Sequence, residues 1–306
     1  MTRILKLWLV AAVLAGVFAT PLDAAVVVSS KLSSESAMLG QMIRLLLNAH
    51  GIATVDRTKI GATPVARKAL LAGEVDLYVE YTGNAGFFFN RAADPAWKDL
   101  QQGYDLGARL DYAANHIVWL TPARASNAWA LAVRRDVARA HHLVTLSDFG
   151  RWVAGGGQVM LACSAEFANA GTLRSLERTY AFTLRSDQMI VLAGGETSAT
   201  IGAAAARTNG TNTAMVYGTD GGIAAADLQL LEDDRHDQPI YAPVPMIREA
   251  VLRQYPQIAA IVKPLMESFT RESLQQLNAR VQIDGESEQA VAADYLRKQR
   301  LLPGTR

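Results

Sequence analysis

The 306-residue chain is predicted to be an α/β protein with two lobes. Strand and helix patterns alternate at its start, and a second alternating series begins near residue 129. A chain of this length can also divide its hydrophobic core between two units. The alternation predicts mostly parallel sheets with helices on both faces.

The first series is placed by hydrophobic period and by turn residues. Apolar residues recur at helical spacing after Ser33, Ser34 and Glu35, and Gly51 suits the position after a helix. Pro64 suits the first turn of the next helix, and Gly73 its end. The expected elements are a strand at 25–30, a helix that starts at Ser33–Glu35 and ends before Gly51, a strand at 52–55, a helix at 63–72 and a strand at 75–81.

The second series and a helical tail follow. The expected elements are a strand at 129–133, a helix from 146, a strand at 159–162, a helix at 198–208, strands at 214–217 and 228–232, and helices at 248–255, 257–269, 271–279 and 287–300. We expect lobe I to comprise residues 25–121 and 241–306, and lobe II residues 122–240. Two crossings of the chain would join them and form a hinge.

The N-terminus predicts export. Arg3 and Lys6 precede an apolar run at 7–19, and small residues follow. This order is typical of a cleaved signal peptide at 1–24, and the run is too short to span a membrane as a helix. An N-terminal membrane anchor is the alternative. Cys163 is the only cysteine, so an internal disulfide is excluded and a buried packing role is expected.

Composition and motifs argue against several function classes. A net charge of +1 with mixed signs does not favour nucleic acid as a partner. Common catalytic motifs are missing, and the five histidines lack metal-ligand spacing, so we expect no metal and no cofactor. Asp76, Glu80 and Asp220 are the carboxylates an exported enzyme could use, although turn and strand-end hydrogen bonds also explain them.

Four aromatic residues stand where strands end or turns begin. They are Tyr81, Trp129, Tyr217 and Tyr241. Ligands of open α/β sheets bind beyond the carboxyl ends of strands, so a cleft between the lobes would be lined by all four. Converging rings suit a quaternary ammonium, whose charge is held by ring faces. Taken singly, each ring is also explained as an ordinary core or strand residue.

Collinear segments over nearly the whole mature chain resemble the osmoprotectant-binding proteins of quaternary-ammonium ABC importers, the ProX/OpuC type. The matching segments are SSKLSSE at 29–35, LGQM at 39–42, GEVDLYVEYTG at 73–83, WALAVRRD at 129–136, GTDG at 218–221, LEDD at 231–234 and LN at 277–278. GFFFN at 86–90 and AGGG at 154–157 extend the similarity to the periplasmic OsmF (YehZ) subgroup.

The resemblance implies a type II periplasmic-binding-protein fold whose two lobes close on the ligand. It also implies delivery to ABC permease subunits in the inner membrane, and we expect the periplasmic protein to be a monomer. The family's cage positions fall on the four rings named above, and nearby polar positions on Asn84 and Asn127. Thr82 and Thr219 are further candidates for orienting the ligand's other end.

Two positions depart from the family pattern. Ser33 replaces an early aromatic residue, and an arginine that grips the betaine carboxylate falls near Ala170. Arg174 is a candidate substitute. The function expected is therefore capture of glycine betaine, choline or a similar cation, without catalysis. Another small polar solute, an exported enzyme, and a sensor or adaptor with the same fold are the alternatives.

Overall fold

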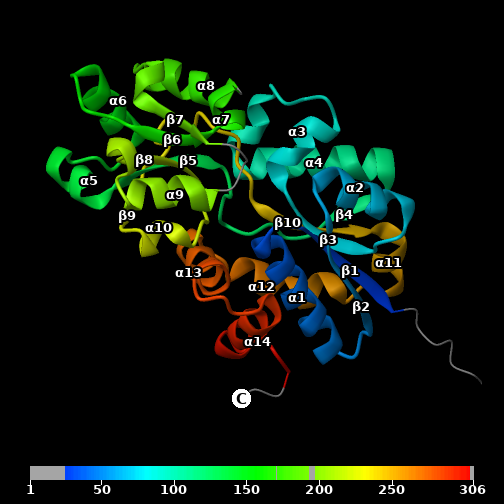
Figure 1. The fold of residues 1–306 in the computed structure, drawn as a ribbon. Helices are drawn as coiled ribbons and strands as arrows, with labels where there is room; N and C mark the ends of the chain where they lie inside the picture. Colours follow the sequence, from blue (N-terminus) through cyan, green and yellow to red (C-terminus); the bar gives the residue numbers. More distant parts are fainter. Residues whose placement is uncertain (1–24, 170, 193–196, 304–306) are drawn as a thin grey trace, which may run out of the picture.

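Two five-stranded sheets, each with helices on both faces, make up the structure (Figure 1). It is a computed structural model that describes residues 25–169, 171–192 and 197–303. The predicted signal peptide at 1–24 therefore lies outside the described residues. The α/β class expected from the sequence is observed in both halves of the molecule.

The first sheet has the strand order β2-β1-β3-β10-β4. Its strands are β1 (Val26–Lys31), β2 (Thr54–Gly61), β3 (Leu77–Tyr81), β4 (Ile117–Trp119) and β10 (Pro243–Arg248). Strands β1, β2 and β3 are parallel, and β10 runs antiparallel to both of its neighbours. The helices before the first crossing are α1 (Ser34–Ala49), α2 (Thr63–Ala72), η1 (Thr82–Asn84), α3 (Ala85–Phe88), η2 (Pro95–Lys98) and α4 (Leu100–Asn115).

The second sheet repeats this plan with the order β7-β6-β8-β5-β9. Its strands are β5 (Trp129–Arg134), β6 (Leu161–Ser164), β7 (Met189–Leu192), β8 (Thr213–Tyr217) and β9 (Leu228–Leu230). Here β6, β7 and β8 are parallel and β5 is antiparallel to β8. The helices are α5 (Arg135–His141), α6 (Leu146–Ala154), α7 (Ala165–Asn169), α8 (Gly171–Tyr180), η3 (Ser186–Gln188), α9 (Thr197–Ala205), η4 (Thr208–Gly210) and α10 (Gly222–Ala225).

The two crossings between the sheets, residues 120–128 and 231–242, are hydrogen-bonded to each other and to β10. Leu120 N donates to Pro245 O at 2.9 Å and Ala123 N to Pro243 O at 2.8 Å. Asn127 N donates to Tyr241 O at 2.9 Å. The crossings therefore run side by side as an extended pair of chains, and the lobe limits expected at 121/122 and 240/241 fall within them.

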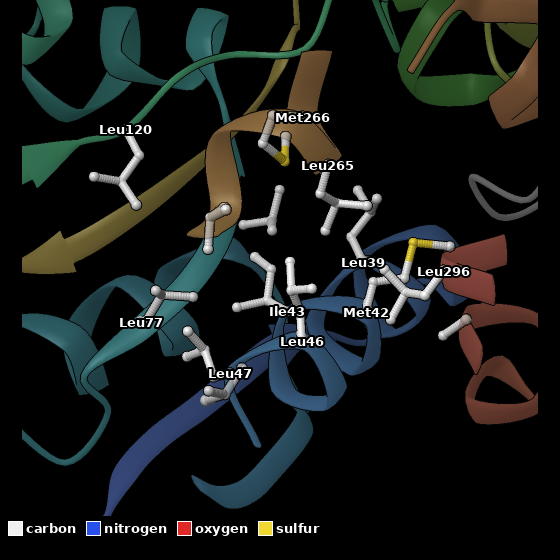
Figure 2. Packing of buried hydrophobic residues seen from close by; sticks show 14 of the residues in the cluster. Leu39, Met42, Ile43, Leu46, Leu47, Leu77, Leu120, Leu265, Met266 and Leu296 are labelled. Atoms are coloured by element: carbon white, nitrogen blue, oxygen red, sulfur yellow. The ribbon is translucent and has the colours of Figure 1, made fainter. Parts of the chain in front are cut away.

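The core of the first unit is built around α1. Its buried face packs against the sheet and against the C-terminal helices (Figure 2). Those helices are α11 (Glu249–Gln254), α12 (Ile258–Glu267), α13 (Arg271–Gln282) and α14 (Glu288–Lys298). Leu39, Met42 and Ile43 are fully buried there, and each such side chain contributes about 1.5–3 kcal/mol through burial. The predicted helical tail thus completes the first unit.

The second unit has its own core, in which Cys163 is fully buried beside Phe149 and Phe167. Burial raises the pKa of the Cys163 thiol to about 11. This supports the packing role expected for the single cysteine, because a neutral buried thiol is a poor nucleophile.

Two large elements were not expected from the sequence. Helix α4 begins after Asp99, whose side chain accepts from Gln102 N as an N-terminal cap. Strand β10 contains Pro243 and Pro245, which argue against a central strand. Toward the first crossing both prolines act as acceptors: Leu120 N donates to Pro245 O and Ala123 N to Pro243 O, and these bonds need no proline N–H. Strand β2 also starts two residues later and runs longer than the 52–55 strand expected.

Candidate functional site

Three of the four aromatic residues lie at strand ends, and the fourth, Tyr241, lies in the second crossing. Tyr81 is the last residue of β3, and Tyr241 precedes Pro243, which pairs with Tyr81. Trp129 opens β5 and pairs with Tyr217 at the end of β8. Tyr241 had been expected shortly after a strand, and instead it lies two residues before β10.

Trp129 and Tyr217 form an aromatic stack on the second sheet. Their ring centroids are 6.4 Å apart with an interplanar angle of 27°. Phe167 from α7 meets Trp129 edge-on at 5.8 Å and 83°. Sequence reasoning missed Phe167, because its apolar surroundings gave no sign of a place beside the site. The stack keeps Trp129 in one orientation, since edge-on and offset ring pairs are the favoured geometries.

Tyr81 and Tyr241 belong to the first sheet and its adjoining crossing. Tyr81 is only 6% exposed. A side chain at Gly83 would approach the ring of Tyr241 to 2.9 Å, so that glycine lets the ring lie flat against the backbone. Burial raises the pKa of both hydroxyls, and the nearby Tyr217 contributes in each case.

A buried ion pair adjoins Tyr81. The Nζ atom of Lys31 lies 4.2 Å from the centroid of the Tyr81 ring and 2.5 Å from Glu80 Oε1. Glu80 is fully buried, and it also accepts from Tyr78 Oη, Tyr81 N and Asn84 Nδ2. Lys31 was missed as a site residue, although it stands in one of the segments that carry the family resemblance.

A second buried carboxylate binds the other end of Tyr81. The Tyr81 hydroxyl donates to Glu35 Oε1 at 2.6 Å, and Asn127 Nδ2 donates to the same oxygen at 2.8 Å. Asn278 Nδ2, from α13, donates to Glu35 Oε2 at 2.6 Å. Glu35 had been treated as a helix-start residue only. The structure places it at the junction of α1, the first crossing and α13.

The four polar candidates have protein partners. Asn84 binds Glu80, and Asn127 binds Glu35 and the Thr219 hydroxyl. The Thr82 hydroxyl donates to Ile240 O and accepts from Ala242 N. Thr82 and Thr219 are 2% and 1% exposed. Their hydroxyls fasten the crossings to the two units, whereas Asn84 and Asn127 are half-buried beside the rings.

Only one of the two positions that depart from the family pattern lies within the described residues. Ala170 lies outside the described residues. Ser33 is exposed and makes no capping hydrogen bond to α1. Arg174 is exposed on α8 and lines a separate surface pocket with Val153, Glu177 and Arg178, to which none of the four aromatic residues contributes. Lys31, in contrast, is a cation that lies over one of the four rings, that of Tyr81.

A pocket of about 600 Å³ lies along the crossings, and Trp129 is the one cage residue that lines it. The pocket also takes in Ser126, Ala128, Pro239 and Ile240 from the crossings. Tyr81, Tyr217 and Tyr241 are not among the residues that line it.

The three carboxylates considered for catalysis all take part in structural hydrogen bonds. Asp76 binds Val27 N and pairs with Arg248, Glu80 pairs with Lys31, and Asp220 accepts from Tyr217 N. Within the described ranges, no cluster of metal-ligating side chains is found. None of the helices described is both long enough and apolar enough to cross a bilayer.

Comparison with known proteins shows similarity over most of the chain. Residues 24–298 match the family model described as the substrate-binding domain of ABC-type glycine betaine transport systems. The glycine betaine-binding protein YehZ of Escherichia coli is 48% identical over 298 residues, which cover 96% of this chain and 98% of the relative. A glycine-betaine-binding protein of Pseudomonas aeruginosa is 29% identical over 94% of this chain and 93% of its own length.

Solved structures show the same fold. Apo YehZ from Escherichia coli superposes with a TM-score of 0.84 and 48% identity, over 91% of this chain and 99% of that one. A glycine betaine/carnitine/choline ABC transporter structure gives 0.79 at 23% identity, over 90% and 99%, and supports the fold alone. The periplasmic-binding-protein fold expected from the resemblance is confirmed. This chain belongs to the family of substrate-binding domains of ABC-type glycine betaine transport systems.

Proposed function

We propose that this protein captures a small quaternary-ammonium solute, such as glycine betaine or choline, between its two lobes and delivers it to ABC permease subunits. The observations that support the proposal are the stack of Trp129 on Tyr217 in the second sheet and the position of Tyr81 and Tyr241 at the paired ends of β3 and the segment that leads into β10. A trimethylammonium group has no N–H to donate, so ring faces are its natural partners, at about 0.5–2 kcal/mol each.

Lys31 supports glycine betaine as one of these ligands. An ammonium group has three donors, and Glu80 accepts from Lys31. A ligand carboxylate beside the Tyr81 ring can therefore take a further donor. Lys31, rather than Arg174, would therefore bind the carboxylate of glycine betaine. In this arrangement no arginine is needed at position 170.

The two lobes give the ligand a way in and out. The rings come from two separate sheets joined by a pair of crossings, so bending of the crossings would bring Tyr81 and Tyr241 toward Trp129 and Tyr217. Closure would exclude water and strengthen each electrostatic contact. We also propose that the chain is exported to the periplasm after cleavage near residue 24, and that it works there as a monomer.

Calorimetric titration of the purified mature protein tests the ligand. Glycine betaine, choline, carnitine and proline betaine are each added, and the carbon isosteres 3,3-dimethylbutyrate and 3,3-dimethylbutanol serve as matched controls. We expect the charged ligands to bind and to be recovered unchanged. Equal binding of an isostere and its charged counterpart would refute the cation cage, and turnover of any ligand would favour the exported-enzyme alternative.

A further inference from the structure

Glu35 is a buried carboxylate whose partners are all neutral. It stands in the first turn of α1 and is 3% exposed. Its oxygens accept from Tyr81 Oη, Asn127 Nδ2 and Asn278 Nδ2 at 2.6–2.8 Å. Within the described part of the chain no lysine, arginine or histidine pairs with it. Burial of a carboxylate without a cationic partner lowers the stability of the fold. A role of Glu35 in ligand recognition would account for its presence there.

The amide groups of Asn127 and Asn278 are oriented so that their nitrogens donate to the Glu35 carboxylate. Both of its oxygens therefore act as acceptors. Asn278 Nδ2 also donates to Thr219 O at 2.8 Å, so the amide nitrogen, not the amide oxygen, must face Glu35. The Asn278 Oδ1 atom is left buried without a partner. In this orientation Asn278 donates hydrogen bonds to Glu35 and to Thr219 O, and its own Oδ1 atom remains without a partner.

The charges around Tyr81 do not cancel. Lys31 lies over the face of the ring and Glu80 neutralises it at 2.5 Å. Glu35 is bound to the hydroxyl of the same ring and adds a further negative charge. The ring therefore stands in a negative local field, and a phenol that donates to a carboxylate also presents a more electron-rich face.

We propose that Glu35 determines ligand charge: its carboxylate is the counter-charge of the aromatic cage and favours solutes with a cationic head over uncharged ones of the same shape. The inference rests on the proposed function of the site and adds a residue that does not itself form the cage. At an effective dielectric constant of about 20, a unit charge about 8–10 Å from the ligand changes affinity on the order of tenfold.

The test compares choline with its uncharged isostere 3,3-dimethylbutanol on wild type and on Glu35→Gln. Glutamine keeps the shape and an acceptor for Tyr81, and a rotated Asn278 amide can accept from its new N–H group. We expect choline affinity to fall about tenfold while the affinity for 3,3-dimethylbutanol changes less than about twofold. Glu267→Gln, an exposed carboxylate on α12, removes the same charge and should leave both affinities unchanged.

The ratio of the two affinities separates a charge effect from a structural one. An equal loss of both affinities in Glu35→Gln would mean that Glu35 only positions Tyr81, and no change in either affinity would mean that its charge does not act on the ligand. Either result overturns the inference. A wild-type protein that binds neither choline nor betaine would instead overturn the proposed function.

Tyr81→Phe gives a second test, which does not depend on the folding of Glu35→Gln. It keeps the ring and the Glu35 charge and removes the hydrogen bond between them. We expect the choline preference to stay within about threefold of the wild-type ratio, because the charge remains in place. Loss of the preference in Tyr81→Phe would assign the discrimination to the hydroxyl and overturn the role of Glu35.

Discussion

The two halves of the candidate cage are built by different means. On the first sheet Tyr81 is surrounded by charges, with Lys31 over its face and Glu35 at its hydroxyl. On the second sheet Trp129 is surrounded by rings, with Tyr217 stacked on it and Phe167 at its edge. Under the proposed function, the first half would fix the ligand's charge and orientation, and the second would offer it aromatic surface. Substitutions should therefore affect stability in one half and ligand binding alone in the other.

The largest expected effect follows from breaking the ion pair of the first half. Lys31→Met leaves Glu80 fully buried without its cation, and we expect the free energy of unfolding to fall by about 3 kcal/mol. Urea denaturation measures it. The double variant Lys31→Met with Glu80→Gln should recover part of this loss, because no charge remains unpaired. If the free energy of unfolding of Lys31→Met falls by less than about 1 kcal/mol, the Lys31–Glu80 pair contributes no more than an exposed surface ion pair, and the expectation is wrong.

A chemical probe reports on the second half alone. The pKa of Cys163 is raised by burial to about 11, so at pH 8 the thiol is protonated and inaccessible. We expect alkylation by iodoacetamide at pH 8 to be at least about 100-fold slower than that of free cysteine. The rate should not change in Lys31→Met under native conditions. Faster labelling in that variant would show that loss of the first half's ion pair opens the second unit.

Ring removal in the second half should weaken binding while leaving the fold intact. Trp129→Leu and Tyr217→Leu keep apolar bulk and remove the aromatic face, so each should reduce betaine or choline affinity about five- to thirtyfold. Tyr241→Leu should behave alike. Tyr81→Leu is a less selective change, because it also releases Lys31 and Glu35. Calorimetric titration measures these affinities, and normal binding in the Trp129 and Tyr217 variants would exclude the cage.

The smallest expected effect concerns the arginine considered as a carboxylate clamp. Arg174→Ala should change betaine affinity less than about twofold, since this exposed side chain lines a pocket that contains none of the four rings. Lys31→Gln, measured beside it, should weaken betaine more than choline, because choline has no carboxylate. A larger effect of Arg174→Ala would return the clamp to α8 and remove that role from Lys31.

Local sequence signals predicted the elements with strong periodicity and clear ends. The helix over 63–72 has Pro64 in its first turn and Gly73 in the left-handed conformation after it, as expected. Helix α4 and strand β10 were missed because their stability comes from partners distant in sequence. Pro245, for example, pairs with Val79 in β3 and accepts from Leu120 N, and both partners are more than 120 residues away in sequence.

In the candidate site, as in the fold, features encoded by local sequence were predicted and features that depend on distant residues were not. The local pattern placed Tyr81 and Tyr217 at strand ends and Trp129 at a strand start, as the structure has them, whereas Tyr241 was expected after a strand and lies before β10. Lys31 and Glu35 carry no local sign of a role, because a lysine after a strand and a glutamate at a helix start are ordinary. Their significance depends on Tyr81, 50 and 46 residues later, and on Asn278 in α13. Contacts of that range require the fold itself.

The place of β10 also bears on the order in which the molecule can assemble. This strand lies between β3 and β4, yet it is made of residues 243–248. The second sheet, in contrast, is complete by residue 230. During synthesis the N-terminal third of the chain therefore waits with an unfilled gap in its sheet while the middle of the chain can already fold. The half that is translated first is expected to be finished last, and its exposed strand edges must persist until nearly the whole chain has emerged.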